Sequence, residues 1–276
     1  MTICVGVKIA EGVVLAADSA SMLQGLVDTP QGQQIGILQT YEYANKVSRI
    51  KDYPIGVMSW GLGSIGARSI PSLIMEFEYT YAPQSSNTGY TVLKVADALL
   101  AFMRQRYDAA YPAGGPRPNL GMFVAGYSEN HFFADEYTVD LSLGAGWGPV
   151  RPDQPDGSPA FGLDWYGLPD TLHRLIKGYD LAAVNELVIR GADQAIVQQW
   201  VDDAVGEIPI LFDGMPLQDA NDLAEYAVHV TIGRYRFAPG PPLCGGNIDI
   251  AVITPNAFRW AQRKRWAITA SAESPE

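Results

Sequence analysis

Residues 2–18 read TICVGVKIAEGVVLAAD, and most of the architecture can be worked out from this stretch. Two apolar runs, residues 3–9 and 12–17, flank a turn-like Ala-Glu-Gly, so the pattern predicts a hairpin of two buried strands. A hairpin that turns near residues 10–11 brings position 18 back beside position 2. Thr2 and Asp18 are therefore expected to lie together at one end of an otherwise apolar strand pair.

The rest of the chain alternates groups of strands with groups of helices. A polar stretch at residues 28–38 is expected to be a long loop or an extended hairpin. Strands are expected at residues 46–50, 55–60, 120–126, 131–139, 247–253 and 257–266. Helices are expected at residues 64–79, from Thr91 onward, and at 169–178, 181–205 and 217–237.

This order of elements indicates the fold class. A doubly wound parallel sheet would alternate strand and helix more strictly. The order strands, two helices, strands, helices, strands fits two antiparallel sheets packed face to face with helix pairs outside. No internal repeat is evident, so we expect one α+β domain over residues 1–276, ending in a disordered tail at about residues 268–276.

Composition excludes several classes of function. The net charge of −11 and the pI of about 4.7 disfavour a nucleic-acid partner. Two cysteines, no apolar run of membrane-span length and no signal peptide indicate a cytoplasmic protein without a membrane partner. His131, His173 and His229 are scattered without ligand spacing, so we expect no metal and no cofactor.

Thr2 has the chemistry of a nucleophile once Met1 is removed. A small second residue permits that removal, and the new N-terminal threonine then carries a hydroxyl and an amine on one residue. The α-amine has a pKa of about 7.7–8.0, so part of it is neutral near pH 7 and can accept the hydroxyl proton. Such a nucleophile needs a nearby cation, and that cation needs an anion to hold it.

Lys46 and Asp18 are the candidates for this cation and anion. Lys46 opens an apolar strand, where a lysine is costly unless it is paired. Taken singly, Asp18 is more often a turn residue at a strand end and Lys46 a solvated edge lysine. The combination of Thr2, Asp18 and Lys46 favours a catalytic site.

At these residues the sequence resembles a proteasome β-type subunit. The opening TICVGVKIAEGVVLAADSA, the lysine-bearing NKVSRI, the strand IGVMSWGLG and the late CGGNIDIAVI are similar to motifs of that family. The Met-Thr start and the tryptophan-rich DWYGLPDTLHRLIKGYD segment look like the bacterial homologues, namely the betaproteobacterial proteasome homologue (BPH) and its relative Anbu. The TICVGV opening favours the former.

The resemblance implies an N-terminal-nucleophile hydrolase with a four-layer αββα sandwich, assembled as a homo-oligomeric ring. Thr2 would attack the peptide bond of a peptide or unfolded protein, with Lys46 held by Asp18. Gly61 would supply the oxyanion N–H, or Trp60 if the strand has no insertion. Substrate-pocket residues would be Ala44 and Met58. An unfoldase partner is not identifiable from the sequence.

The sequence departs from the family pattern at several places. The segment between Asp18 and Lys46 is longer than usual, which predicts a different pocket rim. Tyr166-Gly167 stands where the family has Ser-Gly, and Cys244 stands where it has the serine before two glycines. Tyr166 and Cys244 are therefore only possible supporting residues, and the family's acidic partner before that serine has no match.

Other functions remain open at this point. GLGSIG at residues 61–66 matches the G-x-G-x-x-G pattern of dinucleotide sites, but no second parallel strand with a terminal acid follows. A catalytically weak or silent ring subunit and a small-molecule amidase are further alternatives. Cys4 as a nucleophile is the least favoured, since a thiol in an apolar strand usually packs.

Overall fold

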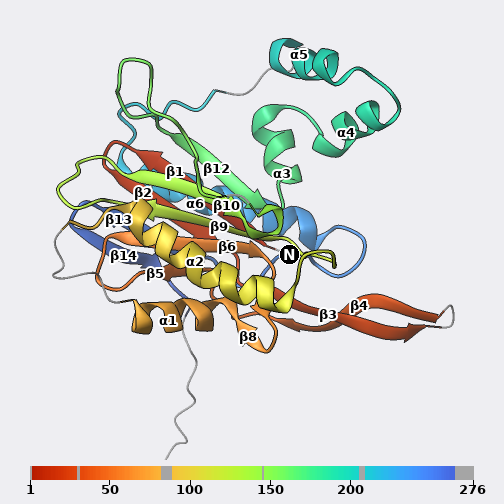
Figure 1. Cartoon of the computed structure of the whole chain (residues 1–276). Coiled ribbons are helices and arrows are strands. Elements are labelled where there is room, and N and C mark those ends of the chain that lie inside the picture. Colours follow the sequence, from red (N-terminus) through yellow and green to blue (C-terminus); the bar gives the residue numbers. More distant parts are fainter. Residues whose placement is uncertain (1, 30–31, 82–88, 145, 205–208, 265–276) are drawn as a thin grey trace, which may run out of the picture.

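The structure of the chain is a computed structural model that describes residues 2–29, 32–81, 89–144, 146–204 and 209–264. Within these residues two five-stranded antiparallel sheets form the centre of the molecule (Figure 1). The first sheet has the order β12 (Gly162–Gly167), β1 (Ile3–Ile9), β2 (Gly12–Ala17), β13 (Asp249–Thr254), β14 (Ala257–Gln262). The second has the order β11 (Gly148–Pro149), β10 (Asp135–Asp140), β9 (Leu120–Gly126), β6 (Ile55–Gly61), β5 (Val47–Arg49).

Alternation along β1 explains why the sheets are covered on both faces. Ile3, Val5 and Val7 pack in one hydrophobic cluster with α6 (Leu217–Arg236) and α3 (Asp170–Leu172). Cys4 points the other way, into a second cluster that joins the two sheets. A third cluster covers the second sheet with α1 (Ile70–Thr80) and α2 (Val92–Ala110). Because successive side chains on a strand face opposite sides, an apolar run such as β1 requires cover on both faces.

The predicted hairpin at residues 3–17 is confirmed. Cys4 pairs with Ala17 and Ile9 with Gly12, so the chain turns at residues 10–11. The predicted strand at 120–126 and the helix at 217–237 also appear, the latter as α6. β12 is an additional strand that pairs with β1 and places Gly167 opposite Ile3.

The helix expected at residues 64–79 begins six residues later. Two short strands, β7 (Ser64–Ile65) and β8 (Arg68–Ser69), form a small hairpin before it. Gly66 lies in this turn with φ +58°, and the Ser69 hydroxyl accepts from Ser72 N at 3.3 Å to cap α1. A residue in the left-handed conformation, such as Gly66, interrupts a helix, and the N-cap Ser69 marks where the next one begins. α1 therefore cannot extend back to residue 64. α2 starts as predicted, with Thr91 as its cap.

The long helix expected over residues 181–205 is two helices. α4 (Leu181–Ile189) and α5 (Gln194–Ala204) are separated at Gly191, which has φ +96°. Asp193 then accepts from Ala195 N at 2.8 Å and begins α5. Residue 205 and the expected disordered tail at 268–276 lie outside the described residues. The helix expected after Pro169 is α3, which continues as a π-helical turn (His173–Lys177) to Gly178.

Other strand boundaries differ from expectation by a few residues. β10 starts at Asp135 rather than 131, and β13 starts at Asp249 rather than 247. β14 ends at Gln262, and residues 265 and 266 of the strand expected there lie outside the described residues. None of the described helices is both long enough and apolar enough to cross a membrane.

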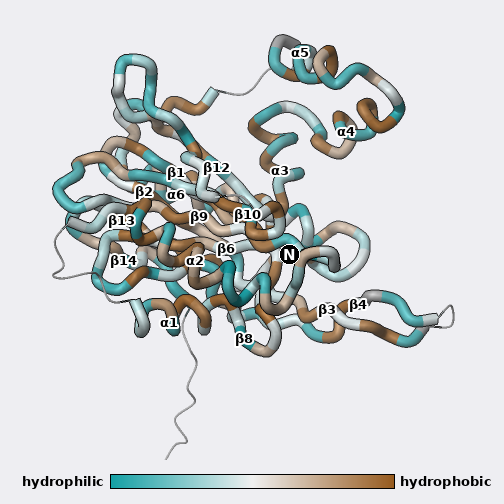
Figure 2. The backbone as a smooth tube through the Cα atoms, in the orientation of Figure 1, coloured by the Kyte–Doolittle hydropathy of each residue, from teal (hydrophilic) through white to brown (hydrophobic). Residues whose placement is uncertain are grey.

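The polar stretch at residues 28–38 lies in an extended hairpin, one of the two forms expected for it. β3 (Ser21–Thr29) pairs with β4 (Gly32–Tyr41), and the pair projects away from the sheets (Figure 1). Hydrophobic residues continue along this hairpin (Figure 2), where Leu26 and Leu38 are 65% and 51% exposed. Two strands alone bury too little surface to be stable independently in water.

Candidate active site

Asp18 is the central polar residue of the site. It follows β2 directly, and the pairing of Cys4 with Ala17 sets it beside the start of β1. Its Oδ1 accepts from Ile3 N at 3.0 Å, and its Oδ2 accepts from Ala20 N at 3.2 Å and Gly245 N at 3.0 Å. A fully buried carboxylate is tolerable only with such partners.

Lys46 supplies the countercharge. It immediately precedes β5, and its Nζ lies 2.6 Å from Asp18 Oδ1, with the two side chains 7% and 0% exposed. Removing one partner of a buried ion pair leaves the other charge buried and uncompensated, so each of these two residues makes the burial of the other tolerable. The predicted association of Asp18 with Lys46 is present in the structure.

Thr2 lies at the junction of two connected grooves. The Lys46 groove, about 510 Å³, is lined by Thr2, Lys46, Ala44 and Gly61 among others. The Trp60 groove, about 630 Å³, is lined by Thr2, Trp60, Tyr111, Asn119 and Gly167 among others. Thr2 is 6% exposed overall, so only a small part of it faces this space.

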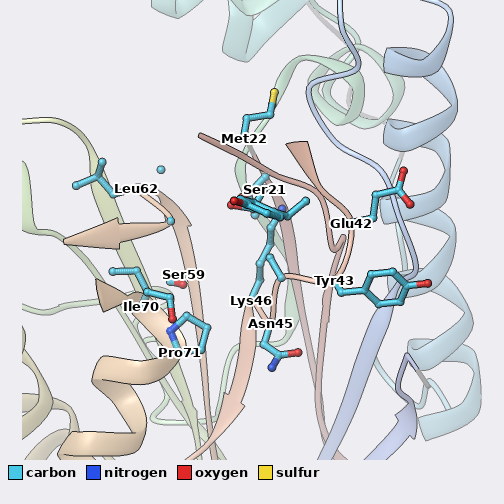
Figure 3. A pocket seen from close by; sticks show the side chains of 16 residues that line it. Ser21, Met22, Glu42, Tyr43, Asn45, Lys46, Ser59, Leu62, Ile70 and Pro71 are labelled. Atoms are coloured by element: carbon cyan, nitrogen blue, oxygen red, sulfur yellow. The ribbon is translucent and has the colours of Figure 1, made fainter. Parts of the chain in front are cut away.

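Figure 3 shows the Lys46 groove with the lysine at its centre. Leu62, Ile70 and Pro71 form one side. Glu42 and Tyr43 come from the opposite side and point away from Lys46 (Figure 3). Ser59 lies on the same side, so the wall nearest the start of α1 is mainly apolar, whereas the charged group at the centre is the lysine.

Gly61 is held in a backbone conformation that favours glycine. Its φ is +86°, and a Cβ at this position would lie 2.2 Å from the carbonyl oxygen of Asn119. Gly61 lines both grooves, together with Thr2. The Trp60 ring covers Gly121, where a Cβ would lie 2.0 Å from it, and Trp60 lines only the second groove.

Not all of the expected pocket and supporting residues line the site. Ala44 lines the Lys46 groove as expected. Met58 is wrong as a pocket residue: it is fully buried in the cluster between the sheets, because alternation along β6 turns it inward. Tyr166 lines neither groove and stacks on Trp60 with ring centroids 4.4 Å apart. Burial raises the pKa of Tyr166 to about 12.

Cys244 also lies behind the grooves rather than in them. It packs in the cluster beneath α6, although the next residue, Gly245, donates to Asp18. Burial raises the pKa of the Cys244 thiol to about 12, and the Asp18 carboxylate contributes in the same direction. Burial likewise raises the pKa of Cys4, whose Sγ donates to Ser59 O at 3.5 Å. Such thiols stay protonated near neutral pH and are poor nucleophiles.

The GLGSIG stretch does not form a dinucleotide loop. β6, which leads into it, is antiparallel to β9, and residues 64–69 form the small β7–β8 hairpin before α1 begins. The third glycine therefore does not open a helix, and a pyrophosphate site of that type needs the helix N-terminus. This alternative is wrong.

Sequence reasoning missed several residues that shape the site. Ser21 and Asn119 line grooves beside Thr2, and the N–H of Gly245 holds Asp18. These residues belong to no motif with a recognisable spacing, so nothing in the sequence distinguished them from other polar or glycine residues in strands and turns. Among the described residues there is no group of three or more His, Cys, Asp or Glu side chains that could hold a metal ion.

The site and fold together describe a mixed α/β protein with antiparallel sheets and a buried lysine–aspartate pair beside an N-terminal threonine segment. Neither a family model nor a curated protein matches the sequence. Among solved structures, the chain is similar to the Anbu (Gly-1) mutant from Hyphomicrobium sp. strain MC1. That match has a TM-score of 0.53 and 13% identity over 99% of this chain and 89% of that chain. The chain therefore shares the fold of Anbu, one of the two bacterial proteasome homologues that its sequence resembles.

Proposed function

We propose that the chain is a proteasome-like threonine endopeptidase whose nucleophile is Thr2, exposed by removal of Met1. The observation that carries the proposal is the buried Lys46–Asp18 pair, with Lys46 lining the same groove as Thr2. A buried lysine–aspartate pair contributes little net stability to a fold, whereas a nucleophile with its own amine as base benefits from a fixed cation nearby.

In this mechanism the Thr2 hydroxyl attacks the carbonyl carbon of a peptide bond. The α-amine of Thr2 takes the hydroxyl proton through a water molecule, and the positive charge of Lys46 favours the developing alkoxide. The N–H of Gly61 donates to the oxyanion, a kind of contact worth about 3–4 kcal/mol in other hydrolases. The C–N bond then breaks: the protonated α-amine returns its proton to the leaving nitrogen, the amine fragment departs, and an ester remains on Thr2. Water then hydrolyses this ester, releases the carboxylic acid fragment and restores the free residue.

The shape of the grooves favours a polypeptide over a small amide as substrate. Thr2, Gly61 and Leu62 are among the residues that line both grooves, so the two grooves form one continuous space beside Thr2. Each groove alone has the volume of a typical small-molecule site, whereas the combined space suits an extended peptide. The apolar wall formed by Leu62, Ile70 and Pro71 makes a leucine-bearing peptide epoxyketone a suitable probe.

We also infer a single domain with four αββα layers, acting in the cytoplasm as a homo-oligomeric ring. The three hydrophobic clusters, one between the sheets and one beneath each set of helices, support the layering. The β3–β4 hairpin supports self-association, because its exposed leucines lie on an extension too small to be stable uncovered. A second copy of the chain is the proposed cover.

A catalytically silent ring subunit is the second candidate. The observation in its favour is that neither Tyr166 nor Cys244, at the positions of the family's supporting serines, lines the grooves. The retained lysine–aspartate pair weighs against it.

The test is an intact mass measured before and after incubation with a peptide epoxyketone, which needs both the hydroxyl and the free amine of an N-terminal threonine. We expect loss of Met1 and one adduct per chain that maps to Thr2. Thr2→Ala should lose Met1 equally and form no adduct. A chain that loses Met1, remains folded and forms no adduct with any of a panel of peptide epoxyketones would support the silent subunit instead.

A further inference from the structure

A second buried ion pair lies directly behind the Lys46–Asp18 pair. Asp249 opens β13 opposite Ala17, the residue before Asp18. Lys264 follows β14, and its Nζ forms a salt bridge with the carboxylate of Asp249. The two side chains are 1% and 2% exposed, and Lys264 N also donates to Asp249 Oδ1 at 3.0 Å.

The ammonium of Lys264 has two hydrogen-bond acceptors in addition to the carboxylate that neutralises its charge. Besides Asp249, it donates to Ser19 Oγ at 3.1 Å and to the carbonyl oxygen of Ala44 at 3.0 Å. A lysine ammonium has three protons, so all three have acceptors. One contact neutralises a buried carboxylate, and the other two reach toward the candidate active site.

Those two contacts end on the segments that carry the charged pair. Ser19 is the residue after Asp18, and Ala44 lies two residues before Lys46. The segments are also joined directly, since Ala44 N donates to Ser19 O at 2.9 Å. Ala44 is thus fixed at its N–H by Ser19 and at its carbonyl by Lys264.

The same cluster reaches the turn that binds Asp18. Ser19 N donates to Gly245 O at 2.9 Å, and Gly245 N donates to Asp18 Oδ2 at 3.0 Å. The Ser19 hydroxyl in turn donates to Asn247 O at 2.6 Å. Lys264 therefore ties together the three backbone segments around Asp18 and Lys46, which are distant in the sequence.

We propose that Lys264, with Asp249 as its anchor, is a positioning residue that sets Lys46 against Asp18. It touches neither groove and acts through the backbone of Ala44 and Ser19. The proposal rests on the proposed threonine peptidase function for its kinetic effect, but its structural effect can be measured independently. A buried ion pair is by itself weak evidence of a stabilising role, so stability and positioning must be separated.

The experiment compares wild type, Lys264→Met and the double variant Asp249→Asn/Lys264→Met. The single variant leaves the Asp249 charge buried and unpaired, and it is expected to lose stability. The double variant removes that charge, keeps a side-chain oxygen at position 249 that can accept from the backbone N–H at position 264, and should recover most of the stability. It still lacks the contacts to Ser19 and Ala44.

Two readouts decide the outcome. The first is inactivation by the peptide epoxyketone, for which we expect the maximal rate of the double variant to fall 10- to 100-fold with the half-saturating concentration unchanged. The second is hydrogen exchange of the Ala44 amide, which should be at least 10-fold faster. A double variant with restored stability, a wild-type inactivation rate and wild-type exchange would overturn the proposal.

The controls separate this inference from the proposed function. Lys8→Met removes another buried lysine, on β1 about 20 Å from Thr2 along the strand, and should leave both readouts unchanged. If wild type forms no adduct, the peptidase proposal fails, and exchange at Ala44 alone then decides whether Lys264 positions this segment. Unchanged exchange in the double variant would refute it.

Discussion

Asp18 accepts four hydrogen bonds, and three of the donors are backbone N–H groups from different segments. A carboxylate with this many donors fixes main chain as well as charge, because each N–H must approach from a set direction. The side chain therefore defines the relative positions of the start of β1, the turn after β2 and the turn before β13. Lys46 is the fourth donor, and it supplies the countercharge.

Gly167 offers a test of how closely the backbone around Thr2 is packed. It has φ +91°, and a Cβ there would lie 2.0 Å from the carbonyl oxygen of Thr2. Gly167→Ala is expected to displace Thr2, lower the epoxyketone inactivation rate at least 10-fold and reduce the free energy of unfolding by about 1–3 kcal/mol. Adduct kinetics and urea denaturation measure the two effects.

Gly66 is the matched control for this substitution. It also has a positive φ, +58°, but a Cβ would meet no atom within 4 Å. Gly66→Ala should therefore cost only about 1–2 kcal/mol of backbone strain and leave the inactivation rate unchanged. Equal effects of the two variants on that rate would show that the contact with Thr2 is not the cause.

At the scale of elements, α1 and α2 are held to each other and to β8 by one carboxylate. Glu76 on α1 forms salt bridges with Arg68 on β8 and with Arg106 on α2, the latter at 2.8 Å. Hydrogen bonds from Arg68, followed by those from Arg106, lower the pKa of Glu76 below its ordinary value of 4.5. Ile70 and Pro71, the first residues of α1, line the Lys46 groove, so this contact also supports that wall of the groove.

The sign of the pKa shift predicts how Glu76→Gln changes stability with pH. A lowered folded-state pKa means that the carboxylate stabilises the fold above pH 4.5, and that this contribution is lost as the pH falls through the folded-state pKa. We expect a lower melting temperature for Glu76→Gln than for wild type at pH 7, and a smaller difference at pH 3. Thermal unfolding at both pH values measures it.

Glu186→Gln serves as the comparison. Glu186 on α4 pairs with Arg190, the residue that follows this helix, but both side chains are at least half exposed, and such pairs contribute little. Its melting temperature should match wild type at both pH values. A Glu76→Gln difference that grew as the pH fell would contradict the assignment.

At the scale of the whole molecule, the β3–β4 hairpin would connect the proposed assembly to the candidate site. Leu26 is exposed in its outer part and Leu38 nearer its base, while Ser21, Met22 and Tyr41 at the base itself line the Lys46 groove. Contact of the outer part with a second copy would therefore also restrain the groove wall. Residues 21–41 lie within the segment that is longer than the family pattern.

Leu26→Asp/Leu38→Asp is expected to disperse the proposed assembly. Wild type should have a mass that is a multiple of 29.9 kDa by light scattering, and the variant should have the mass of one chain with a lower epoxyketone inactivation rate. Ile189→Asp on α4, where Ile189 is 77% exposed, is the control and should leave the assembly intact. A monomeric wild type, or a variant that still assembles, would contradict the role of the hairpin.

The sequence was informative where local periodicity determines geometry. A turn at residues 10–11 and a two-residue repeat suffice to bring Asp18 beside the start of β1, and this was confirmed. Met58 was misassigned by one position: alternation along β6 places its polar neighbour Ser59 in the lining of the Lys46 groove and turns Met58 into the cluster between the sheets. The contact of Lys264 with Ala44 spans 220 residues, and no local pattern specifies it.

The hydrogen bond from Ile3 N to Asp18 bears on whether the site can form before Met1 is removed. The carboxylate binds the main chain one residue after the nucleophile and uses no atom of the Thr2 amine. Asp18, Lys46 and the turns around them are thus complete whatever precedes Thr2. In the proposed mechanism, folding and the removal of Met1 are therefore expected to be separable steps: the pocket forms first, and cleavage before Thr2 then activates a structure that is already in place.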